Sequence, residues 1–146
     1  MTTTKLMEDY IDMYLGTFKY VEGFISQPTS EYDLSFEQFL ILKDIQNTEN
    51  ISMVDIAKKR NVSRSAIARQ LNVLKQLQYI YQEQDTIDRR RINLRLSDQG
   101  AKVERVVTES IKKRFDTWVD VLGEGKVVDL LGLMREFGQK IMVDGR

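Results

Sequence analysis

The chain of 146 residues contains no cysteine and no histidine. Without cysteine it cannot form disulfides, thiolate metal sites or a thiol redox sensor. Without histidine it lacks the commonest general acid–base group, and Ser-His-Asp catalysis is excluded. No acidic loop has the spacing of a calcium site, and no glycine-rich phosphate loop is present. We therefore expect no metal, no cofactor and no enzymatic activity.

Long apolar runs are also missing. No stretch approaches the roughly 20 residues that a membrane-spanning helix needs, and the N-terminus shows no secretory signal pattern. Hydrophobic residues make up 42% of the chain and charged residues 30%, which is typical of a globular protein. The expectation is a cytoplasmic protein of one domain, residues 1–146, with no membrane partner.

Charge is unevenly distributed although the formal net charge is zero. Residues 52–96 contain ten Lys+Arg against four Asp+Glu, a balance of +6, so the rest of the chain carries −6. A basic middle between acidic flanks is typical of a chain that binds a polyanion such as nucleic acid. Chance segregation of surface charge is the alternative.

Apolar spacing and helix caps predict about six helices. The first, Leu6–Ile25, carries two apolar stripes, so it needs neighbours on two sides, and Pro28 is expected to end it. Ser, as at Ser35, Ser52 and Ser63, is a preferred helix N-cap. In chain order the predicted helices are 6–25, 35–46, 53–60, 63–78, 97–122 and 126–142.

Residues 80–97 predict a β-hairpin whose turn carries two aspartates and three successive arginines. In its second strand, alternation places one set of side chains on one face and a second set on the other. The first set is Ile92, Leu94 and Leu96; the second is Arg91, Asn93 and Arg95. A ribbon with arginines at its tip suits a narrow, negatively charged groove. A solvated hairpin with a charged turn is the alternative.

Two short helices joined by a tight turn and followed by a basic hairpin predict a winged helix-turn-helix. The second short helix would enter the major groove and present polar side chains there: Ser63, Arg64, Ser65, Arg69 and Asn72. Nearby cations are predicted to contact phosphate: Lys58, Lys59, Arg60 and Lys75. A cap role alone for Ser63, and plain solvation for the charged residues, are the alternatives.

The chain resembles the MarR family of bacterial transcription regulators. The matching segments are Ile56-Ala57, Val62-Ser63, Leu71-x-x-Leu74, Asp85-x-x-Asp88-Arg89-Arg90 and Leu94-x-Leu96-Ser97-x-x-Gly100. The last two resemble the family's wing signature, with Ser97 in place of the commoner Thr. Ile87 stands where the family often has Arg, which weakens one expected wing contact.

The resemblance implies a mainly α fold with a small β-hairpin, in which the N- and C-terminal helices intertwine in a homodimer. It places the DNA-binding lobe at residues 34–97 and the dimerisation helices at 5–27 and 98–146. It also implies that the wing binds DNA through Asp88, Arg89, Arg90 and Arg91. Arg90 matches the arginine that enters the minor groove, and Asp88 the carboxylate that holds it; simple turn chemistry is the alternative for Asp88.

Family members often sense small organic molecules in a cleft beside the DNA-binding lobe. Aromatic residues that could line such a cleft are Tyr10, Tyr14, Phe18, Phe36, Phe39 and Trp118. Ordinary core packing is the alternative for this set. The sequence thus predicts a DNA-binding transcription regulator that acts as a repressor, in the form of a homodimer bound to an inverted repeat. A winged-helix protein-interaction module without DNA binding is the alternative function.

Overall fold

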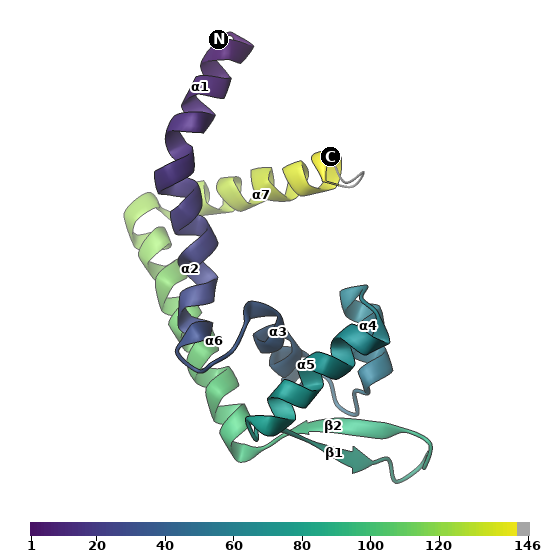
Figure 1. Ribbon diagram of the computed structural model, residues 1–146. Coiled ribbons are helices and arrows are strands. Elements are labelled where there is room, and N and C mark those ends of the chain that lie inside the picture. Colours follow the sequence, from purple (N-terminus) through teal and green to yellow (C-terminus); the bar gives the residue numbers. More distant parts are fainter. Residues whose placement is uncertain (143–146) are drawn as a thin grey trace. The chain divides into compact units, whose positions relative to one another are not determined.

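A computed structural model describes residues 1–142 (Figure 1). The chain divides into two compact units, the first Met1–Glu109 and the second beginning at Ser110. The last four residues of the predicted dimerisation segment 98–146 lie outside the described residues. The first unit holds the helix-turn-helix and the hairpin, so it contains every residue predicted to contact DNA.

The N-terminal helix has three consecutive parts. They are α1 (Thr3–Met13), a π-helical turn η1 (Tyr14–Phe18) and α2 (Lys19–Ser30). The apolar spacing predicted the helix but not its wider turn, because a π-turn adds a residue without changing residue type.

Pro28 does not end this helix, so that prediction is wrong. It lies inside the last turn of α2, which continues to Ser30. Proline removes one N–H there, but the hydroxyls of Thr29 and Ser30 donate to carbonyls three residues earlier, at 2.8 and 2.9 Å. These side-chain bonds stabilise the turn that proline was expected to break.

The winged-helix lobe, residues 34–97, contains three helices that begin at the predicted caps. They are α3 (Phe36–Asn47), α4 (Met53–Arg60) and α5 (Arg64–Gln76). Complete capping boxes start α3 and α4: Ser35 pairs with Gln38, and Ser52 with Asp55. Asn61 adopts a left-handed conformation, φ 54°, and turns the chain from α4 into α5.

The hairpin consists of β1 (Ile80–Gln84) and β2 (Ile92–Leu96), paired antiparallel with Ile80 opposite Leu96 and Gln84 opposite Ile92. We call these strands and their loop, residues 85–91, the wing. The amide of Leu94 also donates to the carbonyl of Ile51 at 2.8 Å, which ties β2 to the turn before α4.

The predicted alternation along β2 is wrong at two positions. Asn93 is buried, with 2% of its surface exposed, whereas Ile92 is 49% exposed. Leu94 is buried as predicted. Asn93 tolerates burial because its amide donates to Asp85 at 2.8 Å and its carbonyl accepts from Arg91 at 3.0 Å. Its face of the hairpin is therefore covered by polar contacts rather than by solvent.

The core of the first unit draws on every element of the winged-helix lobe. The largest fully buried apolar side chains are Ile41, Leu42, Ile56, Leu74, Leu94 and Val107. They come from α3, α4, α5, β2 and the first part of α6 (Asp98–Leu122). The amphipathic helix α5 turns one apolar stripe inward and leaves its opposite side exposed, whereas α3 is covered on most sides by the rest of the lobe.

In the second unit α6 ends and α7 (Glu124–Ile141) follows. Gly123, with φ +88°, forms the break, while Glu124 and Gly125 already belong to α7. Large apolar side chains remain exposed along this unit: Val121, Val128, Leu133, Met134 and Phe137.

The start of α6, Ser97-x-x-Gly100, packs closely against the chain that leads into β1. The Ser97 hydroxyl donates to the carbonyl of Gln78 at 2.6 Å and accepts from the Gly100 amide at 3.0 Å, so the helix start lies against the strand entry. A Cβ on Gly100 would lie 1.9 Å from the carbonyl oxygen of Tyr79, a backbone atom that cannot swing aside. This position admits only glycine without movement of the backbone.

We expect Gly100→Ala to lower the free energy of unfolding by about 1–3 kcal/mol or more, the usual cost of overpacking. Urea denaturation measures this change. The control is Gly125→Ala, because its new Cβ would meet no other described heavy atom within 4 Å apart from its chain neighbours and the nearby backbone of α7. That control should leave stability unchanged or raise it by up to about 1 kcal/mol. A Gly100→Ala protein as stable as the parent would contradict the close approach.

Candidate nucleic-acid interface

The outer face of α5 is polar and fully available to a partner. Its inner face buries Ile67, Leu71 and Leu74. All five residues predicted for groove contacts are exposed: Ser63, Arg64, Ser65, Arg69 and Asn72. The structure therefore brings these five side chains onto one surface, with the helix N-terminus and its unpaired amides at one end.

Ser63 has the cap role that its sequence position predicts. Its hydroxyl accepts from the amide of Ala66 at 3.1 Å and lies 3.2 Å from the hydroxyl of Ser65. Because the Ser63 oxygen still carries a hydrogen, capping does not prevent donation to a phosphate or a base edge. Cap and contact roles are thus compatible at this residue.

The four predicted phosphate contacts divide into two kinds. Lys58 is exposed at the end of α4, and Lys75 is half-buried in the last turn of α5. Lys59 and Arg60, by contrast, both hold the carboxylate of Asp44 in α3. The structure thus gives these two cations a partner within the fold, and contact with phosphate stays a prediction for all four.

Asp44 is a buried charge that depends on those two cations. Its side chain is 2% exposed, and Arg60 donates to its two oxygens at 2.8 and 2.6 Å in a two-pronged pair. The Lys59 ammonium lies 2.8 Å from one of the same oxygens. A buried carboxylate is tolerated only when it is paired in this way, so Arg60 fixes α4 against α3.

The wing loop is organised by Asp85, which the sequence analysis did not include among the site residues. One carboxylate oxygen accepts from the amides of Ile87 and Asp88 at 2.8 and 2.9 Å, and the other accepts from Asn93 at 2.8 Å. The amide of Asp88, then Asn93 and the amide of Ile87, lower the pKa of Asp85 to about 2. The sequence signal was an Asp two residues before a chain reversal, a common turn former.

Asp88 also acts on the backbone of the loop. Its carboxylate accepts from the backbone amide of Arg90 at 3.1 Å. The side-chain amide of Gln84 donates to the carbonyl of Arg89 at 2.8 Å. The contact recorded for Asp88 is therefore to the Arg90 main chain, which supports turn chemistry for this residue. Asp88, Arg89 and Arg90 are all exposed at the tip of the wing.

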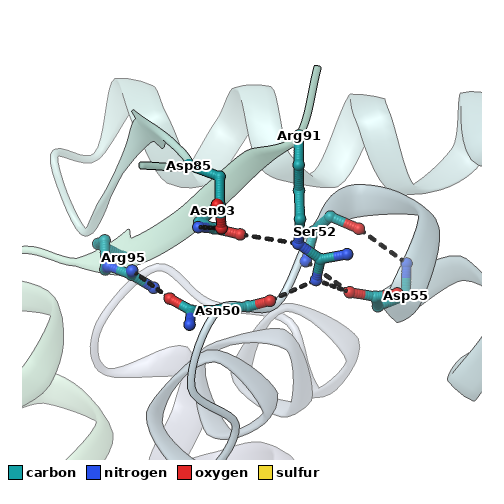
Figure 2. A network of polar contacts seen from close by, with 7 residues as sticks. All are labelled: Asn50, Ser52, Asp55, Asp85, Arg91, Asn93 and Arg95. Atoms are coloured by element: carbon teal, nitrogen blue, oxygen red, sulfur yellow. Dashed lines mark hydrogen bonds and ion pairs between the residues drawn. The ribbon is translucent and has the colours of Figure 1, made fainter. Parts of the chain in front are cut away.

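Arg91 differs from its two neighbours because its guanidinium folds back onto the lobe. Figure 2 shows it between Asp55 and Asn50, donating to the carboxylate of the first and to the carbonyl oxygen of the second. Its Nε also donates to Asn93 at 3.0 Å. The sequence grouped Arg91 with the DNA-contacting arginines, but the structure gives it three acceptors within the chain.

The same turn receives a second arginine. Arg95 donates to the side-chain oxygen of Asn50 at 2.6 Å (Figure 2). It also donates to Glu83 at 3.1 Å. Asn50 has φ 58°, a left-handed conformation that asparagine adopts more readily than most residues. The α3–α4 turn is thus shaped to offer one backbone oxygen and one side-chain oxygen to two arginines of the wing.

Asp55 joins the wing to the cap of α4. Its carboxylate accepts from the amide of Ser52 at 3.0 Å and also binds Arg91. The Ser52 amide lowers the pKa of Asp55, partial burial opposes that change, and Arg91 lowers it further. A groove of about 560 Å³ lies over this contact, lined by Lys58 of α4 and Arg90 of the wing among others. The lining of this groove combines the cations Lys58, Arg90 and Arg91 with the carboxylates of Asp55 and Asp88 and with apolar side chains.

Four of the six residues predicted for the aromatic cleft pack against each other in two ring pairs. Tyr10 packs on Phe18 with centroids 4.8 Å apart, and Phe36 packs on Phe39 at 6.4 Å. Phe39 is 2% exposed and belongs to the core. Tyr14 is exposed on η1, and Trp118, packed on Phe115, belongs to the second unit. A ligand role for these residues stays a prediction.

Within residues 1–142 no group of three or more acidic side chains could hold a metal ion. No helix in that range is long and apolar enough to cross a membrane.

Comparison with known proteins gives a consistent family. Residues 34–92 match the family model described as MarR family. The HTH-type transcriptional regulator SarZ of Staphylococcus aureus is 22% identical over 110 residues, which make up 75% of this chain and 73% of SarZ. YusO of Bacillus subtilis is 20% identical, with a TM-score of 0.74 over 96% of this chain and 99% of its own.

Two other proteins of similar structure were solved in complexes, one with DNA and one with small molecules. Streptococcus pneumoniae FabT, solved in complex with DNA, is 17% identical with a TM-score of 0.71 over 93% of this chain and 95% of its own. Staphylococcus aureus MarR, solved in complex with salicylate and kanamycin, is 16% identical with a TM-score of 0.67 over 94% of this chain and 95% of its own. At these identities the likeness shows the fold, which is the winged helix predicted from the sequence.

Arg60→Ala should destabilise the fold because it leaves Asp44 buried with only Lys59 as a partner. Removing one member of a buried ion pair costs about 3–5 kcal/mol, and the remaining lysine places this case near the lower value. Thermal or urea denaturation measures the loss. Lys58→Ala, two residues earlier and exposed, is the matched control and should leave stability nearly unchanged. Equal stability of the two variants would show that Arg60 is not needed by the fold.

Proposed function

Because the chain belongs to the MarR family of transcription regulators, we propose that it binds a specific double-stranded DNA operator and represses transcription as a homodimer. The observation that carries the proposal is the joint exposure of the polar α5 face and of the wing arginines Arg89 and Arg90. FabT, which has a similar fold, was solved in complex with DNA. The proposed site of action is the cytoplasm.

In the proposed complex the N-terminal half of α5 enters the major groove. Arg64 and Arg69 can each form a two-pronged bond with guanine, and a good pair of this kind contributes roughly 1–3 kcal/mol of discrimination. The amides at the start of α5 and the Ser63 and Ser65 hydroxyls bind phosphate or base edges. These contacts supply sequence specificity, so substitutions here should alter which operators are preferred.

The wing supplies the second contact of each lobe. A guanidinium such as that of Arg90 is attracted by the enhanced negative potential of a narrow, A·T-rich minor groove. The Asp85 and Asp88 bonds to loop amides hold the main chain of the tip. Arg90 therefore adds affinity from a preformed loop, and loses little conformational entropy of the backbone on binding.

A homodimer accounts for the exposed apolar surface of the terminal helices. Leu6, Tyr10, Ile11, Tyr14 and Leu15 of α1 and η1 are all more than half exposed, and α7 carries similar side chains. Such surface is typical of a buried interface in the assembled protein. A two-fold dimer would place its recognition helices about 34–36 Å apart, one turn of DNA, and so bind an inverted repeat.

The family also suggests an effector. Staphylococcus aureus MarR was solved with salicylate, and we propose that a small organic molecule shifts this protein toward a conformation with a different helix spacing. Such a ligand releases DNA only to the extent that it binds that conformation more tightly. Titration of salicylate and related phenolic acids should weaken operator binding and raise the melting temperature. No change in either quantity would remove the effector from the proposal.

Selection of duplexes from a random pool by the purified protein tests DNA binding itself, and a two-fold symmetric consensus is the expected result. On that consensus, Arg90→Ala should weaken binding and lower the slope of log affinity against log salt by roughly one unit. Arg69→Ala should relax sequence preference more than it lowers general affinity.

The two arginine variants control for each other, since each removes one positive charge from the proposed interface. Equal losses by Arg69→Ala on the consensus and on random duplexes would assign Arg69 to phosphate alone. A protein that selects no duplex, or whose binding does not respond to salt, would instead favour a winged-helix module that binds another protein.

A further inference from the structure

We propose that Arg91 is a positioning residue for DNA binding: it ties the wing to the N-terminus of α4 and does not itself contact DNA. The proposal rests on the DNA-binding function above and adds a role for a residue that the sequence alone groups with Arg89 and Arg90. It also makes Asp55, an acidic residue beside a polyanion site, a requirement for tight binding.

The Arg91 side chain is bound by acceptors on several sides. Its guanidinium has acceptors from three different segments: the Asp55 carboxylate in α4, the Asn50 carbonyl in the α3–α4 turn and Asn93 in β2 (Figure 2). Hydrogen bonds between ionised partners are about twice as strong as neutral ones. Reaching a phosphate would break these bonds, so the folded-back position is the stable one.

The wing needs support from the rest of the lobe. It is an antiparallel pair of strands, and a two-stranded hairpin on its own is marginally stable in water. Leu94, in the middle of β2, anchors the strand through its bond to the carbonyl of Ile51. The outer half, next to the loop, has Ile92 exposed and depends on polar contacts. Arg91 stands at the point where the loop enters β2 and bridges to α4 there.

The bridge from Arg91 to α4 also affects the proposed DNA interface. Asp55 is the capping partner of Ser52, so its carboxylate is fixed at the start of α4. Through this contact Arg91 sets the direction of the wing relative to α4, the helix that supports α5. If the bridge breaks, Arg90 must be ordered on DNA at an entropic cost, and affinity falls without the loss of any phosphate contact.

The test uses the full-length protein and its selected duplex, with affinity measured across a salt series. Arg91→Ala should weaken binding by about five- to thirtyfold while keeping the parent salt slope. Arg90→Ala, one residue away and with the same loss of charge, is the matched control and should lower the slope by roughly one unit. A slope for Arg91→Ala that falls as in Arg90→Ala would overturn the proposal.

Asp55→Asn gives the sharper arm, because the two roles of Arg91 predict opposite signs. Asparagine can still accept from the Ser52 amide, so the cap is retained. If Arg91 contacted DNA, removal of a nearby negative charge would strengthen binding or leave it unchanged. If Asp55 and Arg91 form a positioning contact, Asp55→Asn should weaken DNA binding. The Asp55→Asn/Arg91→Ala double variant should then bind almost as well as whichever single variant binds more weakly. Equal or tighter binding by Asp55→Asn would refute the role.

A measurement without DNA separates this proposal from the function on which it rests. Amide hydrogen exchange of residues 85–91 should quicken in Arg91→Ala and Asp55→Asn but not in Arg90→Ala. If the parent binds no duplex, the proposed function fails, yet this exchange pattern still decides whether Arg91 holds the wing. Unchanged exchange in both variants would overturn the tether.

Arg91→Lys guards against loss of fold. It keeps the charge but cannot reach three acceptors in the same fork geometry. The Arg91→Lys protein should have a melting temperature close to that of the parent, and it should bind DNA more weakly with the same dependence on salt. DNA affinity equal to that of the parent would show that the positive charge alone is needed.

Discussion

A hairpin of two strands cannot hold a fixed direction in water by its own ladder, and this constraint shapes the whole DNA-facing side of the lobe. The chain meets it with polar contacts between the wing and the α3–α4 turn. Arg91 and Arg95 both donate to Asn50, and Arg91 also binds Asp55. The wing is consequently part of the lobe at its base and free only at its tip, where Arg89 and Arg90 lie.

The basic character of residues 52–96 has to be divided between folding and binding. Lys59 and Arg60 compensate the buried Asp44, and Arg91 and Arg95 hold the wing. The remaining exposed cations in the segment include Lys58, Arg64, Arg69, Arg89 and Arg90. Net charge therefore overstates the charge that is available to a polyanion, because a cation that is paired within the chain contributes much less to the attraction of phosphate.

Local signals in the sequence predicted most of the fold. Serine caps located the starts of α3, α4 and α5, and apolar spacing separated their buried faces from the face that carries Arg64 and Arg69. Such features depend on residues within one or two turns of each other, which a linear pattern contains. The wing signature likewise located the hairpin, and Gly100 in that signature has a steric reason in the carbonyl of Tyr79.

What the sequence could not supply are pairings between distant residues. Arg91 and Asp55 are 36 positions apart, and Arg60 and Asp44 are 16 apart; no periodicity marks either pair. Period-two alternation failed at Asn93 because a polar network covers that face of the hairpin. Alternation assumes one wet face and one dry face, and the strand has neither near the loop.

The π-helical turn at Tyr14–Phe18 has a consequence for the N-terminal helix as a surface. One extra residue in a helix of 3.6 residues per turn rotates everything beyond it by about 100° around the axis. A stripe that looks continuous on a helical wheel drawn through residues 6–25 is therefore dislocated in the middle. A surface that packs against both α1 and α2 must follow this offset, so a one-residue deletion at the π-turn would realign half of the helix without substituting any remaining side chain.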